Sequence, residues 1–472
     1  MARRTTTIRR LRPFVQAIAV VAVVVAVTVV VVTLAPNYVG SSGTTVDGFL
    51  SVGPVVAEPP ATFWAVGTHV QGFQNTTLSS DLNDTPISYF RWGAGGDAQN
   101  QTTGVSYSAN GTESGLGSSD PAFVQFCRAR GCQAILTVPG EIDDPGAAAV
   151  TVRYVEQVLG FHPAFWSIGN EPQLWTHFGI PWTDWRWTDA STPTPEEYAV
   201  EVQHYIAAMR SVDTAIRIIG IQSDIGGPLG AAWMGDVVAR NGPNLSAVAY
   251  HSYPAGVPPL GSGVVQFLAT GLTHGFPEDY RATEATVDAA CPRCDIPVFV
   301  DEYNGDDNGY YAAEIESYPD VPLVAAAVVR GLQENASQFS FFDLEDTSSL
   351  TSFGLLDGNG NPRPTFYLYS EFFRNLSIGA IDNTTILGGG SYMFAVVGHT
   401  AGATSLFVVN ANVSDSLRLS LNGSGFPIGS GGTVYQWAPG ERLPLITGWG
   451  ARSLASSWAI PPEGILLIDV PT

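Results

Sequence analysis

Short apolar runs recur along the middle of the chain and alternate with stretches of helical periodicity. Between residues 61 and 377 the strand candidates are 63–70, 87–92, 133–138, 164–169, 216–221, 246–251, 297–302 and 338–343. Most of them lack strict alternation of polar and apolar residues, which is typical of parallel strands covered on both faces. Between most of them the periodicity predicts helices, at 121–130, 147–159, 194–211, 233–240, 321–332 and 366–376.

Eight strands that alternate with helices predict an α/β fold, a (β/α)8 TIM barrel over residues 61–377. The alternative is a doubly wound sheet that binds a nucleotide. A Gly-rich phosphate loop would then follow the first strand, but residues 70–73 (VQGF) do not resemble one. The barrel is therefore the preferred interpretation.

Beyond residue 377 the pattern changes to short alternating strands between Gly, Asn, Ser and Pro residues. The candidates are 391–397, 405–409, 416–421, 433–437 and 464–470. This alternation predicts an antiparallel β-sandwich over residues 378–472. Residues 37–60 are rich in Gly, Ser and Pro and are interpreted as a linker, whose apolar positions also suit one additional sandwich strand.

A basic cluster and a long uncharged run mark the N-terminus. Five arginines lie within the first 12 residues, and residues 17–35 are uncharged and rich in valine. A run of this length predicts a signal-anchor or transmembrane segment over residues 1–36, which would make the membrane a partner. The alternative is a cleaved signal peptide, although no A-x-A site follows. Both interpretations place the remaining chain outside the cytoplasm, at the cell surface or secreted.

The composition narrows the range of partners. Charged residues make up only 14% of the chain, the formal net charge is −22, and there is no lysine. An acidic chain repels nucleic acid, so no nucleic-acid partner is expected. The excess of carboxylates suits a protein that works in acid, where these groups become neutral. Ten N-x-S/T sequons agree with a glycosylated surface: Asn75, Asn83, Asn100, Asn110, Asn244, Asn335, Asn375, Asn383, Asn412 and Asn422.

The cysteines form two local pairs, Cys127 with Cys132 and Cys291 with Cys294. Outside the cell, such pairs most simply form two short disulfides. The alternative is a single four-cysteine zinc site. The two pairs precede the third and seventh predicted strands, which lie on opposite sides of an eight-stranded barrel, so the barrel order favours the disulfides.

Residues suited to chemistry gather at the ends of the predicted strands, where the active site of a barrel lies. The fourth strand ends in Asn170 and Glu171, and the seventh ends in Glu302. At or just beyond the other strand ends stand His69, Arg91, Trp92, Asp97, Glu141, His251, Tyr253 and Asp343, while Asn304 follows Glu302. Two glutamates that face each other across the mouth provide the pair of carboxyls that glycoside hydrolysis needs.

This arrangement resembles glycoside hydrolase clan A, the retaining (β/α)8-barrel glycosidases. The resemblance covers roughly residues 61–472 and rests on four elements: Asn170-Glu171, Arg91, His251-Ser-Tyr253 and Glu302. It implies that Glu171 is the acid/base and Glu302 the nucleophile. The barrel followed by a sandwich is similar in layout to the heparanase/β-glucuronidase-like and the β-xylosidase/α-iduronidase-like members.

Each proposed role has a physical reason. Glu171 must carry a proton to protonate the leaving oxygen, whereas Glu302 must be ionised to attack the anomeric carbon. Arg91 and Tyr253 can stabilise and orient that anion. Sugar contacts are expected from Asn170, His69, Trp92, Asp97, Trp175, His251 and Asn304. The mechanism needs no cofactor and no metal.

Several alternatives stay open at this level. His251 suits a core histidine as well as a ligand contact, and Asp343 and Glu345 are rival nucleophiles. The indole-rich loop 175–187 is either a carbohydrate platform or a hydrophobic plug. The predicted function is a retaining glycoside hydrolase that acts on extracellular oligo- or polysaccharides by a two-glutamate mechanism. The alternative is a non-catalytic glycan-binding or structural cell-surface glycoprotein.

Overall fold

The computed structural model describes most of the chain after residue 42. The described residues are 43–68, 82–92, 119–138, 140, 144–174, 193–253, 272, 275–305, 316–346, 353–427, 431–441, 444–449 and 457–472. The predicted segment 1–36, the loop 175–187 and the residues His69, Asp97, Glu141 and Trp175 lie outside them. Within the described ranges no helix has both the length and the apolar character needed to cross a membrane.

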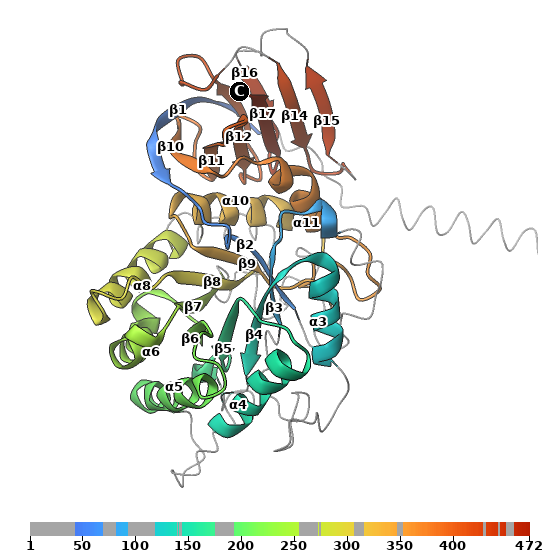
Figure 1. Ribbon diagram of the computed structural model, residues 1–472. Coiled ribbons are helices and arrows are strands. Elements are labelled where there is room, and N and C mark those ends of the chain that lie inside the picture. Colours follow the sequence, from blue (N-terminus) through green and yellow to red (C-terminus); the bar gives the residue numbers. More distant parts are fainter. Residues whose placement is uncertain are drawn as a thin grey trace, which may run out of the picture. The chain divides into compact units, whose positions relative to one another are not determined.

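Eight parallel strands close into a barrel in chain order, and the last strand pairs with the first (Figure 1). The predicted (β/α)8 barrel is therefore confirmed. Its strands are β2 (Trp64–Thr68), β3 (Tyr89–Trp92), β4 (Gln133–Val138), β5 (Phe165–Ile168), β6 (Ile218–Ser223), β7 (Ala247–Ser252), β8 (Val298–Tyr303) and β9 (Gln338–Phe341). Phe165 and Phe299 meet edge to face at 5.4 Å although β5 and β8 are not neighbours, so both rings fill the barrel interior.

Helices surround this barrel, as Figure 1 shows. They are α3 (Ser119–Arg130), α4 (Pro145–Arg153) with η3 (Tyr154–Val158), α5 (Pro195–Arg210), α6 (Gly227–Asn241), α8 (Phe276–Ala290), α10 (Asp320–Gln333), and α11 (Pro364–Tyr367) with η7 (Leu368–Phe372) and η8 (Phe373–Asn375). Single turns η1 (Leu82–Asp84), η4 (Pro172–Leu174) and η5 (Gly242–Asn244) connect other elements. Thr194 and Glu197 form a capping box that fixes the start of α5.

The remaining strands form one nine-stranded, mostly antiparallel sheet, which fits the predicted sandwich. Its strands are β1 (Thr45–Ala57), β10 (Ala380–Leu387), β11 (Met393–His399), β12 (Ala403–Asn410), β13 (Ser416–Ser420), β14 (Gly432–Trp437), β15 (Leu445–Trp449), β16 (Ser457–Ile460) and β17 (Ile465–Pro471). The N-terminal β1 lies beside β10, with which it is antiparallel (Figure 1). Its other neighbour is β13, with which it is parallel.

The sheet packs on the barrel through α10 and the helical turns after α11. The Phe372 and Trp437 rings stack at 6.3 Å, and the Gln333 side chain donates to backbone carbonyls of β10 and β11. The Tyr318 hydroxyl donates to the carbonyls of Trp437 and Glu463. Residues Thr45–Thr472 accordingly form one compact unit with a shared apolar core.

Both predicted disulfides are confirmed. Cys127 and Cys132 join the end of α3 to the start of β4, with their Cα atoms 4.8 Å apart. Cys291 and Cys294 close a turn between α8 and β8, with a Cα separation of 5.5 Å. Each bridge closes a loop of only a few residues, so it stiffens a connection locally rather than linking distant parts of the barrel.

Candidate active site

Polar side chains from five of the eight strands converge at the C-terminal end of the barrel. Arg91 comes from β3, Gln222 from β6 and His251 from β7, while Asp301 and Glu302 come from β8. Asn170 and Glu171 directly follow β5. All of these side chains except Glu171 belong to residues that are at most 2% exposed, so their mutual hydrogen bonds and charges act in a largely dry environment.

The chain turns sharply at the end of β5 and thereby places Glu171 at the mouth. Gly169 has a φ of 65° and Glu171 a φ of 48°, both in the left-handed region that residues with a Cβ rarely adopt. The Glu171 N–H donates to the Gln222 carbonyl at 2.8 Å, which holds the strained turn against β6. Such strain persists where surrounding structure enforces it, and it is common at functional sites.

Glu171 and Glu302 lie close together. Three atoms lie within 4.8 Å of one another: one carboxylate oxygen of Glu171, one carboxylate oxygen of Glu302 and one ring nitrogen of His251. Retaining glycosidases hold their two carboxyl groups about 5–5.5 Å apart, whereas inverting enzymes need about 6.5–9.5 Å to admit a water. The separation therefore fits a retaining site.

The surroundings of Glu302 favour its ionised form. The Arg91 Nη1 and the Tyr253 hydroxyl both donate hydrogen bonds to this carboxylate, the latter at 2.8 Å, and the His251 Nδ1 lies 3.4 Å away. Burial disfavours the charge, but the charges of His251 and Arg91 and these hydrogen bonds outweigh it and lower the pKa of Glu302 to about 2. The carboxylate is therefore held as an oriented anion.

Glu171 has different surroundings. Its Oε1 lies 2.7 Å from the His251 Nδ1, and its Oε2 accepts a hydrogen bond from the Asn170 amide at 3.2 Å. Its side chain is 14% exposed, compared with 3% for Glu302. Glu171 is thus the member of the pair that can reach water and an incoming leaving group.

His251 links the two glutamates. Burial opposes its charge, yet the neighbouring Glu302 and Glu171 raise the pKa of His251 to about 9. The ring is therefore an imidazolium at neutral pH. The contacts of His251 with Glu171 and Glu302 indicate an electrostatic role within the site, and a direct contact of His251 with a ligand stays a prediction.

The rival nucleophiles lie in the segment after β9. Burial and the neighbouring Asp343 raise the pKa of Glu345 to about 7, which favours its neutral form in mild acid. A nucleophile must instead be ionised, and the donors Arg91 and Tyr253 converge on Glu302. The geometry therefore favours Glu302 over both rivals.

Two predicted sugar contacts are engaged within the protein. Trp92 is buried, and its ring stacks on Phe123 with centroids 5.7 Å apart. The Asn304 amide donates to the carbonyls of Phe342 and Phe353, and its oxygen accepts from the Gly305 N–H. Direct sugar contacts from these two residues stay a prediction.

Sequence reasoning missed Gln222 and Asp301. The Gln222 amide donates to the Asp301 Oδ2 at 2.7 Å, and its oxygen accepts from the Arg91 Nη2 at 3.1 Å. The available signal was a polar residue inside an otherwise apolar strand, in IIGIQS, and an acid directly before the predicted nucleophile, in VFVDEY.

Two groups among the described residues have spacing that suits a metal ion. One is formed by Glu171, His251 and Glu302, where the adjacent Arg91 cation would repel a second positive charge. The other is Glu156, His162 and Asp213, which precede β5 and β6 and so lie at the opposite end of the barrel. Neither group changes the interpretation of the site.

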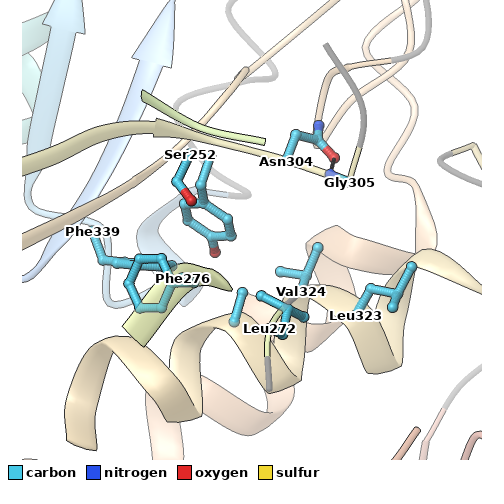
Figure 2. Close-up of a pocket in the computed structure, with 10 residues that line it drawn as sticks. Ser252, Leu272, Phe276, Asn304, Gly305, Leu323, Val324 and Phe339 are labelled. Atoms are coloured by element: carbon cyan, nitrogen blue, oxygen red, sulfur yellow. Dashed lines mark hydrogen bonds between the residues drawn. The ribbon is translucent and has the colours of Figure 1, made fainter. Parts of the chain in front are cut away.

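An apolar pocket lies behind the site, between β8, β9, α8 and α10. Figure 2 shows its lining, which includes Leu272, Phe276, Leu323, Val324 and Phe339. A sugar requires several convergent hydrogen-bonding groups, and this lining is almost wholly apolar. We therefore assign the pocket to the packing between strands and helices rather than to substrate binding.

Comparisons with known proteins agree on the fold. No protein-family model and no curated protein matches the sequence. Among solved structures, an α-L-arabinofuranosidase from Thermotoga maritima has a TM-score of 0.67 at 14% identity, covering 90% of this chain and 100% of its own. A family 51 α-L-arabinofuranosidase from Bifidobacterium longum has a TM-score of 0.66 at 15% identity, covering 89% and 99%.

A xyloglucanase of glycoside hydrolase family 44 from Paenibacillus polymyxa has a TM-score of 0.63 at 11% identity, covering 90% of this chain and 100% of its own. The chain therefore has the fold of barrel-plus-sheet glycoside hydrolases over nearly its whole length. This confirms the predicted resemblance to clan A at the level of the fold. The finer similarity to heparanase-like or β-xylosidase-like members stays a prediction.

Proposed function

We propose that this protein is a retaining glycoside hydrolase that uses Glu302 as nucleophile and Glu171 as acid/base. The observation that carries the proposal is the pair of closely spaced carboxyls in unlike surroundings. Glu302 is buried and receives the Arg91 and Tyr253 hydrogen bonds, whereas Glu171 is partly exposed beside His251. A pair whose surroundings differ in this way can divide the acid and nucleophile roles.

In the first step, a Glu302 oxygen forms a bond to the anomeric carbon of the sugar. The bond from that carbon to the leaving oxygen breaks, and Glu171 gives its proton to the leaving oxygen. The products are an alcohol and a glycosyl ester of Glu302. The Arg91 and Tyr253 donors fix the attacking carboxylate. Asn170, whose amide donates to the Glu171 Oε2, is the side chain from which we propose a contact to the sugar 2-hydroxyl.

In the second step, the Glu171 carboxylate takes a proton from water. The water oxygen bonds to the anomeric carbon, and the ester bond to Glu302 breaks, which returns Glu302 to its anionic form. Two inversions give net retention at the anomeric centre. The partly exposed position of Glu171 suits this exchange with solvent.

The substrate we propose is an uncharged glycan. A uronic acid needs a cationic partner, and the chain has no lysine. Arg91 and His251, the cations among the described residues of the site, are both buried. Arg91 is engaged with Asp301, Glu302, Asn170 and Gln222, and His251 lies between Glu171 and Asp301. Neutral pentosides, such as the arabinofuranosides on which two structural neighbours act, are the first compounds to test.

We place this activity outside the cell, at the cell surface or in secreted form. The basic N-terminus followed by the uncharged residues 17–35 supports this placement, as do the ten sequons. The two disulfides also suit an oxidising compartment.

A panel of aryl glycosides tests the function. We expect hydrolysis of at least one neutral glycoside, such as the α-L-arabinofuranoside, β-xyloside, β-glucoside or β-galactoside, and much weaker hydrolysis of the glucuronide. Glu302→Gln and Glu171→Gln should each reduce turnover at least about 10³-fold while the circular dichroism spectrum is unchanged. The matched control Glu345→Gln should keep most of the activity.

Two further measurements separate the roles of the glutamates. Azide should restore turnover of an activated aryl glycoside by Glu171→Ala, and NMR of the first product should show retained anomeric configuration. Loss of activity in Glu345→Gln but not in Glu302→Gln would reassign the nucleophile. An inverted product would refute the double displacement, and binding without hydrolysis of any glycoside would favour the non-catalytic alternative.

A further inference from the structure

We propose that Asp301 is a positioning residue that keeps both His251 and Arg91 positively charged through the two halves of the reaction. This inference rests on the proposed function, because it assigns a task to a third carboxylate beside the two that react. Asp301 directly precedes Glu302 on β8 and is fully buried. A buried carboxylate that neither meets substrate nor gains exposure needs another reason for its place.

The contacts of Asp301 join three strands. Its Oδ2 accepts a hydrogen bond from the Gln222 amide of β6 at 2.7 Å and lies 3.4 Å from the Arg91 Nε of β3. Its Oδ1 lies 3.5 Å from the His251 Nε2 of β7. Asp301 therefore contacts both cations of the site, and at His251 it faces the ring nitrogen opposite to the one that faces Glu171 and Glu302.

His251 consequently sits between acids on both faces of its ring. Its Nδ1 faces Glu171 at 2.7 Å and Glu302 at 3.4 Å, and its Nε2 faces Asp301. Among the described residues, the other charged or titratable groups of this cluster are Arg91 of β3 and Tyr253, which both donate to Glu302. Each ring nitrogen of the imidazolium therefore faces at least one carboxylate, so its positive charge is compensated on both sides of the ring.

The charges balance in both states of the enzyme only if Asp301 is counted. Before attack, Glu171 is protonated, and the two cations face two anions, Glu302 and Asp301. In the glycosyl-enzyme, Glu302 is a neutral ester and Glu171 has become the carboxylate, so the two cations again face two anions. A buried cluster with net charge is costly, so Asp301 lets the reaction proceed without one.

Removal of the Asp301 charge should shift the pKa of His251 in a definite direction. A nearby negative charge raises the pKa of a histidine beside it. Without the Asp301 charge, His251 would therefore release its proton at lower pH. Loss of the imidazolium charge at lower pH would move the alkaline limb of the activity profile toward acid.

Asp301→Asn tests the proposal because it removes the charge and preserves the shape. We expect the alkaline limb of kcat/KM against pH to move by about 1–3 pH units toward acid, the size of effect that a carboxylate at this distance has on a neighbouring pKa. The matched control is Asp382→Asn, which also removes a buried aspartate beside a histidine, since the Asp382 Oδ2 lies 2.8 Å from the His399 Nε2 in the C-terminal sheet. The control should leave the limb in place.

An activity-independent readout distinguishes failure of this proposal from failure of the proposed function. In protein labelled with ¹⁵N-histidine, the His251 signal, assigned through His251→Gln, should titrate at lower pH in Asp301→Asn than in the wild type. If Asp301→Asn does not fold, Gln222→Leu should give a smaller shift of the same sign, because it removes the hydrogen bond that stabilises the Asp301 anion. A variant with reduced kcat but an unmoved limb and an unmoved His251 titration would overturn the proposal.

Discussion

Two residues of the site have pKa values displaced in opposite directions by the same contacts. The pKa of Glu302 is lowered from 4.5 to about 2, and that of His251 is raised from 6.5 to about 9. The stabilising contribution of the Glu302 anion is therefore present above pH 4.5 and is lost as the pH falls through about 2. The contribution of the His251 cation is present below pH 6.5 and is lost as the pH rises through about 9.

The lowered pKa of Glu302 leads to a prediction for activity in acid. The nucleophile stays ionised until the pH approaches about 2, so we expect the acid limb of kcat/KM to lie near that pH. Tyr253→Phe removes the hydroxyl that donates to the Glu302 Oε2 at 2.8 Å and should move this limb toward higher pH. The pH dependence of kcat/KM measures the position of the acid limb in the wild type and in Tyr253→Phe. Circular dichroism at each pH is the control for unfolding. An acid limb that stays in place in Tyr253→Phe would show that this hydrogen bond does not set the ionisation of Glu302.

At the scale of single elements, the turn after β5 carries the acid/base and α5 follows it. The Thr194 hydroxyl accepts a hydrogen bond from the Glu197 N–H, and the Glu197 carboxylate accepts one from the Thr194 N–H. These two bonds satisfy donors that would otherwise be exposed at the start of the helix. The cap therefore stabilises the start of α5.

Thr194→Ala should accordingly lower the free energy of unfolding by about 1 kcal/mol and leave kcat unchanged. Thr194→Ser keeps the hydroxyl and is the matched control, expected to stay within a few tenths of a kcal/mol of the wild type. Urea unfolding measures the stability, and the aryl glycoside assay measures kcat. A kcat that falls together with stability would indicate that the start of α5 positions Glu171.

The elements that sequence reasoning located best are those with strong local signals. The runs predicted at 133–138 and 164–169 correspond to β4 and β5 almost residue for residue, because continuous apolar runs between turn residues suit buried strands. The strands β10, β15 and β16 were missed, because sheet partners elsewhere in the chain, rather than local pattern, decide whether such short segments become strands.

The same distinction holds for the site. Glu171 and Glu302 could be named in advance, because they stand at strand ends within recognisable motifs. The contact of Asp301 with His251 and Arg91 could not, because it depends on the tilt of β3, β7 and β8 and on which face of each strand points inward. A one-residue change in that register would turn Asp301 away from both cations.

At the scale of the whole molecule, the sheet and the barrel share one core. Phe372 stacks on Trp437, and Phe373 meets Phe407 edge to face at 5.7 Å. Arg330 of α10 lies over the Phe394 ring of β11 at 5.1 Å. Such an interface indicates that neither part is a free module.

Truncation after residue 377 tests this architecture. It exposes the apolar face of η7 and removes both partners of β1, so we expect insoluble or aggregated protein. The milder comparison is Trp437→Ala in the full-length chain. This variant should stay folded, with its free energy of unfolding lowered by about 3–5 kcal/mol. For the truncated chain and for Trp437→Ala, size-exclusion chromatography measures the aggregation state and thermal melts measure the stability. A truncated barrel that is monomeric and as heat-resistant as the full chain would show that the sheet is an independent appendage.

The position of β1 has a consequence for the order of events during synthesis. Its partner β10 begins at Ala380, more than 300 residues after β1 ends at Ala57. At a ribosomal rate of about 5–20 residues per second, β1 leaves the ribosome roughly 15–65 s before its neighbours exist. The barrel strands can meet during that wait, whereas the backbone of β1 remains without its partner strands β10 and β13. We therefore expect a nascent chain to become resistant to protease only after its C-terminal strands have been synthesised. A chain on a ribosome that stalls before residue 380 has β1 without either of its partner strands.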